Sequence, residues 1–295
     1  MDFYNEIKNE LINNQLYKKA KDYSKNRNDL ETYYKVGKLL CDAGKHYGED
    51  IIKNYSLKLT QELGKGYTPT NLRYMKQFYL FEEKYHAVRD DLTWTHYREI
   101  MKLKDINIVN YYIGIAIKEN LSYRQLRQKI KSQEYERLDE TTREKLINHA
   151  NTNVSDFIKN PIIIKNVNNY DNNKEYALKQ SILENLPNFL EQLGDGFSFI
   201  KDEYKIKLGN HFNYIDLLLF NYIYNCFIVV ELKVTKLTYE HIGQIKHYMN
   251  YIDKNIKKES NSKTVGIIIC KYDDKFVMEY CSDDRIFRTT YILTN

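Results

Sequence analysis

The fold is decided by the stretch NYIDLLLFNYIYNCFIVVELK, residues 213–233, in which three ionisable side chains interrupt apolar and β-branched runs. Two runs, Tyr214 to Phe220 and Cys226 to Lys233, flank a short polar and aromatic connection at residues 221–225. This pattern predicts an antiparallel hairpin closed by one of the longer loops. Charges inside apolar strands are costly, so the three ionisable groups are candidates for chemistry.

The register of this hairpin brings the charged groups together. If the numbers of paired residues sum to about 446 or 447, Asp216 faces Val230 or Glu231, and a one-residue bulge decides between them. Side chains alternate along a strand, so Glu231 and Lys233 share one face while Leu232 points to the other. Two carboxylates and one ammonium are therefore expected on a single patch.

Facing carboxylates lower the stability of a sheet by a few tenths to about 1 kcal/mol unless something compensates their charge. Mg²⁺ is bound in proteins by one or two carboxylates together with water and substrate phosphate, and Mn²⁺ is the expected substitute. Asp216 and Glu231 are therefore the candidate metal ligands. The alternative is an edge strand on which Glu231 and Lys233 are solvated residues that discourage aggregation.

The residues after the hairpin predict a helix and one more strand. Apolar residues recur at helical spacing within residues 238–253, which predicts a helix packed on the strands. Gly243 is expected to allow close approach of this helix to the sheet. Gln244 is expected near the strand end that carries Lys233, where its amide can orient water or phosphate. Residues 264–271, TVGIIICK, predict a buried strand.

The aspartate, the E-x-K strand, the helix and the following strand together resemble the YhcG-like branch of the PD-(D/E)xK nuclease superfamily. The resemblance implies a restriction-endonuclease-like mixed sheet in which the acids bind the metal. The metal activates the attacking water and holds the scissile phosphate, while Lys233 positions water or stabilises charge. The N-terminal half shares the resemblance, which implies an α-helical, winged-helix-like domain there. The stretches that carry it are YYKVGK at 33–38, residues 67–79, LTWTHY at 92–97, LSYRQL at 121–126, VVELK at 229–233, GQIKHY at 243–248 and VGIIIC at 265–270.

The resemblance also implies a glutamate on the first core helix, which completes the metal or water network. Aligning the helix at residues 174–193 with the family pattern puts Lys179 at that position, and a lysine cannot bind Mg²⁺. Glu175 lies on the apolar stripe that faces the sheet, whereas Glu184 is expected to face solvent. Glu175 is therefore the expected auxiliary acid, and an i,i+4 ion pair with Lys179 is the alternative explanation.

Composition limits the class of protein. The chain has 295 residues, 42% of them hydrophobic, which is enough to bury a core in one large or two ordinary domains. No apolar run reaches the length of a membrane span, and no signal peptide is expected. The four cysteines lack the paired spacing of a metal site or a disulfide framework, so a reducing cytoplasm is the expected location.

The N-terminal half predicts helices and a helix-turn-helix outline. Residues 2–65 show helical periodicity, a turn follows at residues 63–70, and Thr68 or Thr70 is expected to cap the next helix. That helix presents polar side chains that read base edges or bind phosphate, or that are ordinary polar positions of a helical bundle. The candidates for nucleic-acid contact on it are Asn71, Arg73 and Lys76.

The positive charge of the chain is concentrated in the same half. Residues 1–150 carry 27 Lys and Arg against 22 Asp and Glu, while the remainder carries 18 of each. Within residues 118–131 five basic residues accompany one acid, a pattern that fits either phosphate binding or a solvated helix face. The candidates for phosphate contact there are Arg124, Arg127 and Lys131.

Two domains are expected: a helical nucleic-acid-recognition domain at residues 1–150 and an α/β nuclease domain at 155–295, with a last strand at 276–280 or 289–293. The expected function is Mg²⁺-dependent hydrolysis of phosphodiester bonds, with DNA as the expected substrate. The alternative is an inactive nuclease fold that serves as a docking module in a bacterial defence or mobile-element complex. Cleavage of both strands of a duplex requires two active sites, which favours a homodimer.

Overall fold

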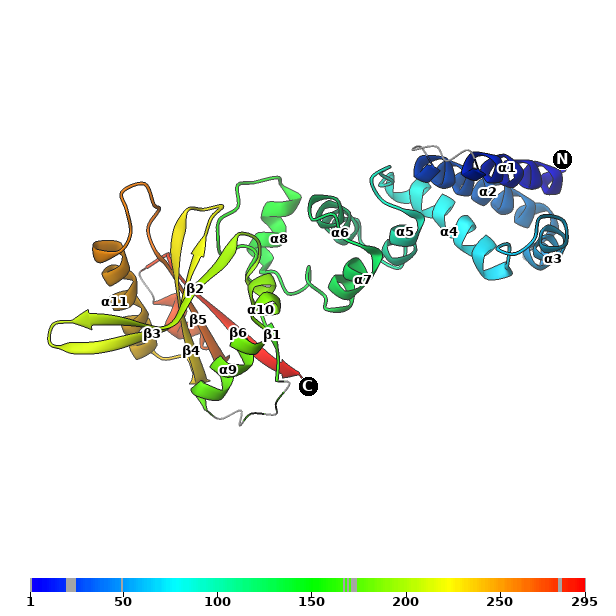
Figure 1. Ribbon diagram of the computed structural model, residues 1–295. Helices are drawn as coiled ribbons and strands as arrows, with labels where there is room; N and C mark the ends of the chain where they lie inside the picture. Colours follow the sequence, from blue (N-terminus) through cyan, green and yellow to red (C-terminus); the bar gives the residue numbers. More distant parts are fainter. Residues whose placement is uncertain are drawn as a thin grey trace. The chain divides into compact units, whose positions relative to one another are not determined.

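The structure is a computed structural model that describes residues 2–19, 25–48, 50–166, 168, 170, 174–280 and 283–294. The chain divides into two compact units, Met1–Tyr135 and Glu136–Asn295 (Figure 1). The expected end of the first domain at residue 150 lies inside the second unit. Arg137 is held there because its Nη1 donates hydrogen bonds to the backbone oxygen of Pro161 at 2.8 Å and to Gln192 Oε1 at 2.6 Å.

All regular elements in the described part of the first unit are helices. The expected winged-helix form is corrected, because the described part of this unit contains no strand that could form a wing. The helix caps explain the difference: Asp105 Oδ1 accepts the N–H of Asn107 at 2.8 Å, and Ser122 Oγ accepts that of Gln125 at 3.4 Å, so each starts another helix. The helices are α1 Phe3–Lys19, α2 Lys25–Tyr47, α3 Ile51–Leu63, α4 Pro69–Tyr85, α5 Trp94–Ile100, α6 Ile106–Lys118 and α7 Tyr123–Lys131.

The α3–turn–α4 segment keeps the helix-turn-helix outline. Of the two expected caps, Thr68 holds the position, since its Oγ1 accepts the N–H of Asn71 at 3.3 Å. Trp94 lies against Tyr33 and Phe78, with ring centroids 4.6 and 5.4 Å away. These aromatic contacts join α2, α4 and α5 in one core.

The second unit is built on a six-stranded mixed sheet in the order β1-β6-β5-β4-β3-β2. Neighbours from β2 to β4 are antiparallel, and β4, β5, β6 and β1 are parallel to their neighbours. The strands are β1 Ile162–Lys165, β2 Phe197–Leu208, β3 His211–Asn221, β4 Cys226–Lys236, β5 Val265–Tyr272 and β6 Ile286–Thr294. The helices are α8 Glu140–Ile147, α9 Glu175–Glu184, α10 Leu186–Leu193, α11 Tyr239–Asn255 and α12 Lys275–Glu279. The expected hairpin, the expected helix after it and the interruption near Pro187 are confirmed.

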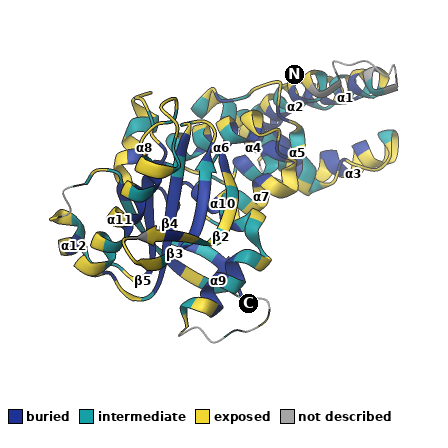
Figure 2. Ribbon diagram, turned by 60° about the vertical axis from the view of Figure 1, so that its left-hand side comes forward, coloured by how far each residue is buried: buried dark blue, intermediate teal, exposed yellow. Residues whose placement is uncertain are grey.

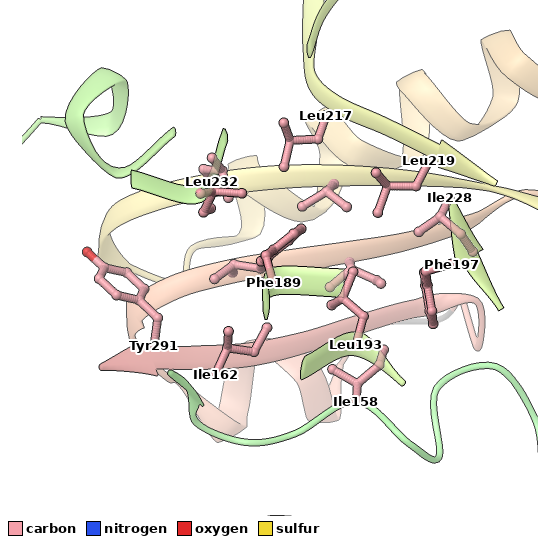
Figure 3. Packing of buried hydrophobic residues seen from close by; sticks show 14 of the residues in the cluster. Ile158, Ile162, Phe189, Leu193, Phe197, Leu217, Leu219, Ile228, Leu232 and Tyr291 are labelled. Carbon is pink, nitrogen blue, oxygen red and sulfur yellow. The ribbon is translucent and has the colours of Figure 1, made fainter. Parts of the chain in front are cut away.

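Helices cover both faces of this sheet. On one face, Leu217, Leu219, Ile228 and Leu232 pack against Phe189 and Leu193 of α10, and Figure 3 shows this cluster. On the other face, residues of α11 including Ile245 and Met249 pack against Val229 and Ile268. Figure 2 shows the central strands buried along most of their length. The odd-numbered positions 229 and 231 of β4 thus face α11, and Leu232 faces α10.

One expectation about the last strand is confirmed and one about a glycine is wrong. Of the two positions expected for the last strand, residues 289–293 are confirmed because they lie in β6, which pairs with β5 and β1, whereas α12 covers residues 276–279. Gly243 does not mediate the helix–sheet contact, because nothing lies within 4 Å of the place where its Cβ would be. The close approach is made from the strand: a Cβ on Gly266 would lie 2.7 Å from Met249 Sδ and 2.9 Å from Ile245 Cδ1.

Two expectations from the sequence concerned the cysteines and membrane-spanning segments. Cys41, Cys226 and Cys270 are buried and form no disulfide, and Cys281 lies outside the described residues. Among the described helices, none has the length and hydropathy needed to cross a membrane.

Candidate active site

Asp216 and Glu231 lie directly beyond the last pair of the β3–β4 ladder. Leu217 pairs with Val230, and the register runs without a shift from there to the hairpin loop. Val230 is therefore not the partner of Asp216, and Asp216 and Glu231 are the next residues of the two strands beyond that pair. The backbone N–H of Leu232 donates a hydrogen bond to Asp216 Oδ2 over 2.9 Å. The two candidate metal ligands are therefore fixed on adjacent strands.

Glu231 is a buried carboxylate with half of its hydrogen-bonding capacity unused. Its residue exposure is 2%, and Oε1 lies 2.8 Å from Lys233 Nζ. Oε2 is buried and has no hydrogen-bond partner among the described residues. Burial, followed by the repulsion of Asp216, raises the pKa of Glu231 to about 7. This carboxylate therefore retains an acceptor that a cation could satisfy.

Opposing effects act on the pKa values of Asp216 and Lys233, the other two charged groups of the patch. Burial raises the pKa of Asp216, although the Leu232 amide and the ammonium groups of Lys233 and Lys179 act in the other direction. Burial alone would lower the pKa of Lys233, but attraction to Glu231 and to Glu175 outweighs it, and the pKa of Lys233 is raised. Lys233 therefore stays protonated and neutralises one of the carboxylates.

Glu175 reaches this patch from the first residue of α9. Its Oε2 lies 3.4 Å from Lys233 Nζ. Glu184 is engaged elsewhere, since its Oε1 accepts hydrogen bonds from the Tyr170 hydroxyl and from Asn168 Nδ2. Lys179 Nζ lies 2.5 Å from Glu203 Oε1, so its ion pair is made across to the sheet and not along the helix with Glu175. Of the acids on this helix, Glu175 is the one that the fold brings to Lys233.

Glu203 was not expected at the site. Asp202 pairs with Leu217 and Tyr204 with Ile215, which puts Glu203 opposite Asp216 on the β2 side. Its backbone has φ 45°, in the left-handed region, and its side chain is 60% exposed. Three acids thus follow one another across β2, β3 and β4. No spacing rule in the sequence connects Glu203 with the D…E-x-K pattern, because the bulge between Phe199 and Lys201 changes the β2 register.

Helix α11 contributes Gln244 and two residues that were not expected. Gln244 Nε2 donates a hydrogen bond to the Tyr248 hydroxyl over 2.9 Å. Burial raises the pKa of Tyr248, and the charges of Glu231 and Asp216 add to the effect. Burial and the charge of Lys233 lower the pKa of His241. Helical spacing could have found all three, since positions 241, 244 and 248 follow one another on one face of the helix.

The residues present fit a divalent cation that also needs ligands from outside the protein. Among the described residues, no three His, Cys, Asp or Glu side chains gather closely enough to hold a metal ion by themselves. Mg²⁺ does not need such a cage, because it is commonly held by one or two carboxylates with water and phosphate. Asp216 and the unpartnered Oε2 of Glu231 supply that pair.

The candidate nucleic-acid contacts lie on α4 and α7 of the first unit. Arg73, Arg124, Arg127 and Lys131 are exposed, and Lys76 is half-buried. Asn71 is engaged in the turn, since its Nδ2 donates a hydrogen bond to the Gly66 oxygen over 2.8 Å. Its carboxamide therefore has one oxygen left for a ligand.

A mixed sheet that gathers an aspartate, a glutamate and the lysine of an E-x-K strand defines the class of PD-(D/E)xK nuclease domains. A family model described as the YhcG PDDEXK nuclease domain matches residues 155–294. A second, described as the DUF1016 N-terminal domain, matches residues 6–137. The chain belongs to the YhcG-like family of the PD-(D/E)xK superfamily and carries the family's N-terminal domain.

Individual proteins resemble the chain to different extents. "Putative nuclease YhcG" of Escherichia coli (strain K12) is 24% identical over 283 residues, which cover 81% of this chain and 76% of that protein. The crystal structure of a repair endonuclease from Pyrococcus abyssi matches 41% of this chain and 48% of its own, with 17% identity and a TM-score of 0.30. The structure of an EndoMS–dsDNA2 complex matches 40% of this chain and 44% of its own, with 18% identity and a TM-score of 0.32.

Proposed function

We propose that the chain is a Mg²⁺-dependent nuclease that hydrolyses phosphodiester bonds in DNA, with Mn²⁺ as a substitute ion. The observation that carries the proposal is the buried Glu231, which lies close to Asp216 and leaves Oε2 without a partner. An unpaired buried acceptor is destabilising, and two neighbouring carboxylates add repulsion. A site that keeps an unpaired buried acceptor and two repelling carboxylates is one that a cation and a substrate phosphate would complete.

The residues around this pair have distinct roles in the proposal. Asp216 and Glu231 hold the ion, which would lower the pKa of the attacking water and neutralise charge on the phosphate. Lys233 balances the charge of Glu231 and reaches the reacting phosphate from the same face. Gln244, which bonds Tyr248, orients water or phosphate. Glu175, beside Lys233, is the auxiliary acid.

The first unit is proposed to bind the nucleic acid. The support is the excess of basic residues in the first 150 positions and the exposure of Arg73, Arg124, Arg127 and Lys131. Phosphate contacts of this kind release counterions, so the binding of the full chain to a labelled duplex in EDTA should weaken log-linearly as salt rises. Charge reversal of Arg127 should reduce that salt slope by about one if it contacts a phosphate.

The test is phosphodiester hydrolysis by the full chain with and without Mg²⁺. Asp216→Ala, Glu231→Ala and Lys233→Ala should each abolish cleavage while the circular-dichroism spectrum stays folded. The matched control is Asp202→Ala, an acid on β2 that has no place in the proposed site. Cleavage that persists in EDTA, or in all three site variants, would remove the proposal. No cleavage by the wild type with Mg²⁺ would leave the docking module as the better account.

A further inference from the structure

The first unit contains a small cavity of about 180 Å³ beside the turn between α3 and α4. It is lined by one face of α1, by residues of α2, α4 and α5, and by the turn itself. Several side chains of the lining are held by contacts within the unit. Gln15 Nε2 donates to the Tyr67 hydroxyl over 2.7 Å, and Lys18 Nζ lies 3.2 Å from the Tyr33 hydroxyl.

The lining combines three kinds of side chain that recognise a nucleotide. Tyr33, Tyr67 and Trp94 provide aromatic rings, on which bases stack. Gln15 and Asn71 provide carboxamides, the groups that pair with base edges. The buried Asn14 does not, because its Nδ2 donates to Asp29 Oδ1 and its Oδ1 accepts from Asn28 Nδ2. Lys65 provides an ammonium group that can neutralise phosphate, whereas the ammonium of Lys18 is already paired with Asp29 Oδ1 over 2.7 Å. No Asp or Glu belongs to the described lining.

The groups are oriented and still have capacity to bind. Asn71 Nδ2 donates a hydrogen bond to the Gly66 oxygen, and Gln15 Nε2 donates one to the Tyr67 hydroxyl. The oxygens of both carboxamides carry no hydrogen bond in the described structure. Lys65 is exposed in the turn and has no described ion pair, so its ammonium is available to an anion at the cavity. A ligand that offers N–H donors on a flat ring and an attached anion satisfies these groups together.

A second cavity of the same unit has the opposite character. It measures about 460 Å³ and its lining includes Glu31, Glu82, Glu83 and Asp90. Carboxylates at this density repel phosphate. The smaller cavity is therefore the one suited to a nucleotide.

We infer that the small cavity binds one nucleotide unit of a single-stranded or unpaired segment of nucleic acid. The base enters between the rings of Trp94 and Tyr67 and the carboxamides of Gln15 and Asn71, and its phosphate meets Lys65. This site rests on the proposal that the chain acts on nucleic acid but does not involve hydrolysis. It adds a base-binding site to the first unit, distinct from the phosphate contacts proposed on α7.

Trp94 makes the inference testable, because it is the only tryptophan of the chain and lines the cavity. The intrinsic fluorescence of the full chain is followed in EDTA, so that no probe is cleaved. The probes are inorganic phosphate, dAMP and a short single-stranded oligodeoxyadenylate. We expect saturable quenching by dAMP and by the oligonucleotide, with the oligonucleotide tighter, and no saturable change with phosphate.

Lys65→Glu is the variant and Lys38→Glu, an exposed lysine of α2 outside the cavity, is the matched control. Lys65→Glu should weaken the oligonucleotide and lower the slope of log affinity against log salt by about one, while Lys38→Glu should leave both unchanged. Gln15→Ala should weaken dAMP binding without changing the salt slope. A loss of charge, by contrast, would change that slope. Quenching by dAMP alone would assign the cavity to free nucleotides and overturn the strand assignment.

Two further outcomes separate this inference from the proposed function. Oligonucleotide binding by fluorescence anisotropy without any change at Trp94 would overturn the cavity site and leave the surface contacts intact. Saturable quenching in a protein that cleaves nothing with Mg²⁺ would uphold the cavity site and reject the nuclease. If Lys65→Glu and Lys38→Glu weakened oligonucleotide binding equally, the effect would come from the overall charge of the protein, and this result would also overturn the site.

Discussion

The backbone N–H of Leu232 donates its hydrogen bond to Oδ2 of Asp216, so a main-chain group of β4 orients the acid of β3. Glu231, the neighbour of Leu232, has no such support for its Oε2. The two acids of the candidate site are therefore unequal: one is positioned by the sheet, and the other depends on Lys233 and on whatever ligand enters.

Replacing Glu231 with Gln should stabilise the metal-free fold at pH 8 and abolish cleavage. The folded-state pKa of Glu231 is about 7, above the ordinary value of 4.5, so the folded protein binds the proton more tightly than the unfolded chain. Wild-type stability therefore falls as pH rises from about 4.5 through 7. The pKa of about 7 already includes the attraction of Lys233, so the expected gain for the variant is about 1–3 kcal/mol at pH 8.

Urea unfolding in EDTA at pH 5 and pH 8 measures this effect. The gain should be small at pH 5, where the folded wild-type carboxyl is already protonated. Mg²⁺ should raise the unfolding midpoint of the wild type at pH 8 and have little effect on the variant, since a ligand of the folded state stabilises it. A Gln variant that is less stable than the wild type at pH 8 would mean that the ion pair with Lys233 outweighs the cost of burial.

Glu175→Gln should lower turnover by about tenfold or more if this acid assists proton transfer, while Glu184→Gln should stay near the wild-type rate. The two residues lie on the same helix, but Glu175 is 3.4 Å from Lys233 and Glu184 is bound to Asn168. Turnover is compared over a range of Mg²⁺ concentrations, which separates weaker metal binding from slower chemistry. Full activity of Glu175→Gln at every concentration would leave the site with Asp216 and Glu231 as its acids.

Lys179→Met should move the acidic limb of the rate profile to higher pH. The positive charges of Lys179 and Lys233 favour the ionised form of Asp216, against burial and the negative charge of Glu175. Removing one cation raises the pKa of Asp216, so a higher pH is needed to ionise it. The measurement is kcat/KM against pH. The comparison variant is Glu203→Gln, which removes the ion-pair partner of Lys179 and should not shift the limb upward; an equal shift in both variants would indicate a structural effect.

Gly266→Ala should destabilise the second unit by about 1–3 kcal/mol, whereas Gly243→Ala should stabilise it by about 0.5–1 kcal/mol. A methyl group on Gly266 would meet Met249 and Ile245 of α11, but on Gly243 it would meet nothing within 4 Å. Denaturant unfolding of both variants measures the difference. A neutral Gly266→Ala would show that α11 can move away from the sheet at little cost.

The β3–β4 hairpin could be predicted closely because its information is local. The apolar runs fix the two strands and the short connection fixes their register, so Asp216, Glu231 and Lys233 follow from residues 213–233 alone. The position of Glu175 also followed, since helical geometry separates it from Glu184. These residues of the candidate site can therefore be predicted from short segments of the sequence.

The rest depends on contacts between distant segments. Glu203 reaches the row of acids through a bulge in β2, and nothing in the residues around it predicts where the register changes. Gly266 and Gly243 are indistinguishable as glycines near a helix–sheet contact, and only the packing of Met249 tells them apart. Residues 132–172 look like a junction between domains by composition, yet Lys145 pairs with Asp156 at 2.8 Å within the second unit.

The position of β6 has a consequence for how the second unit assembles. Ile162 of β1 pairs with Tyr291 of β6, and β6 in turn pairs with β5, so β6 is the link between β1 and the remaining strands. Until β6 is in place, β5 and β1 both present open edges of unpaired backbone groups, which attract other chains. Pairing over such a sequence distance is slow. Nascent or truncated chains that lack β6 can form the β3–β4 hairpin with its acids, but they carry it in a sheet prone to aggregate.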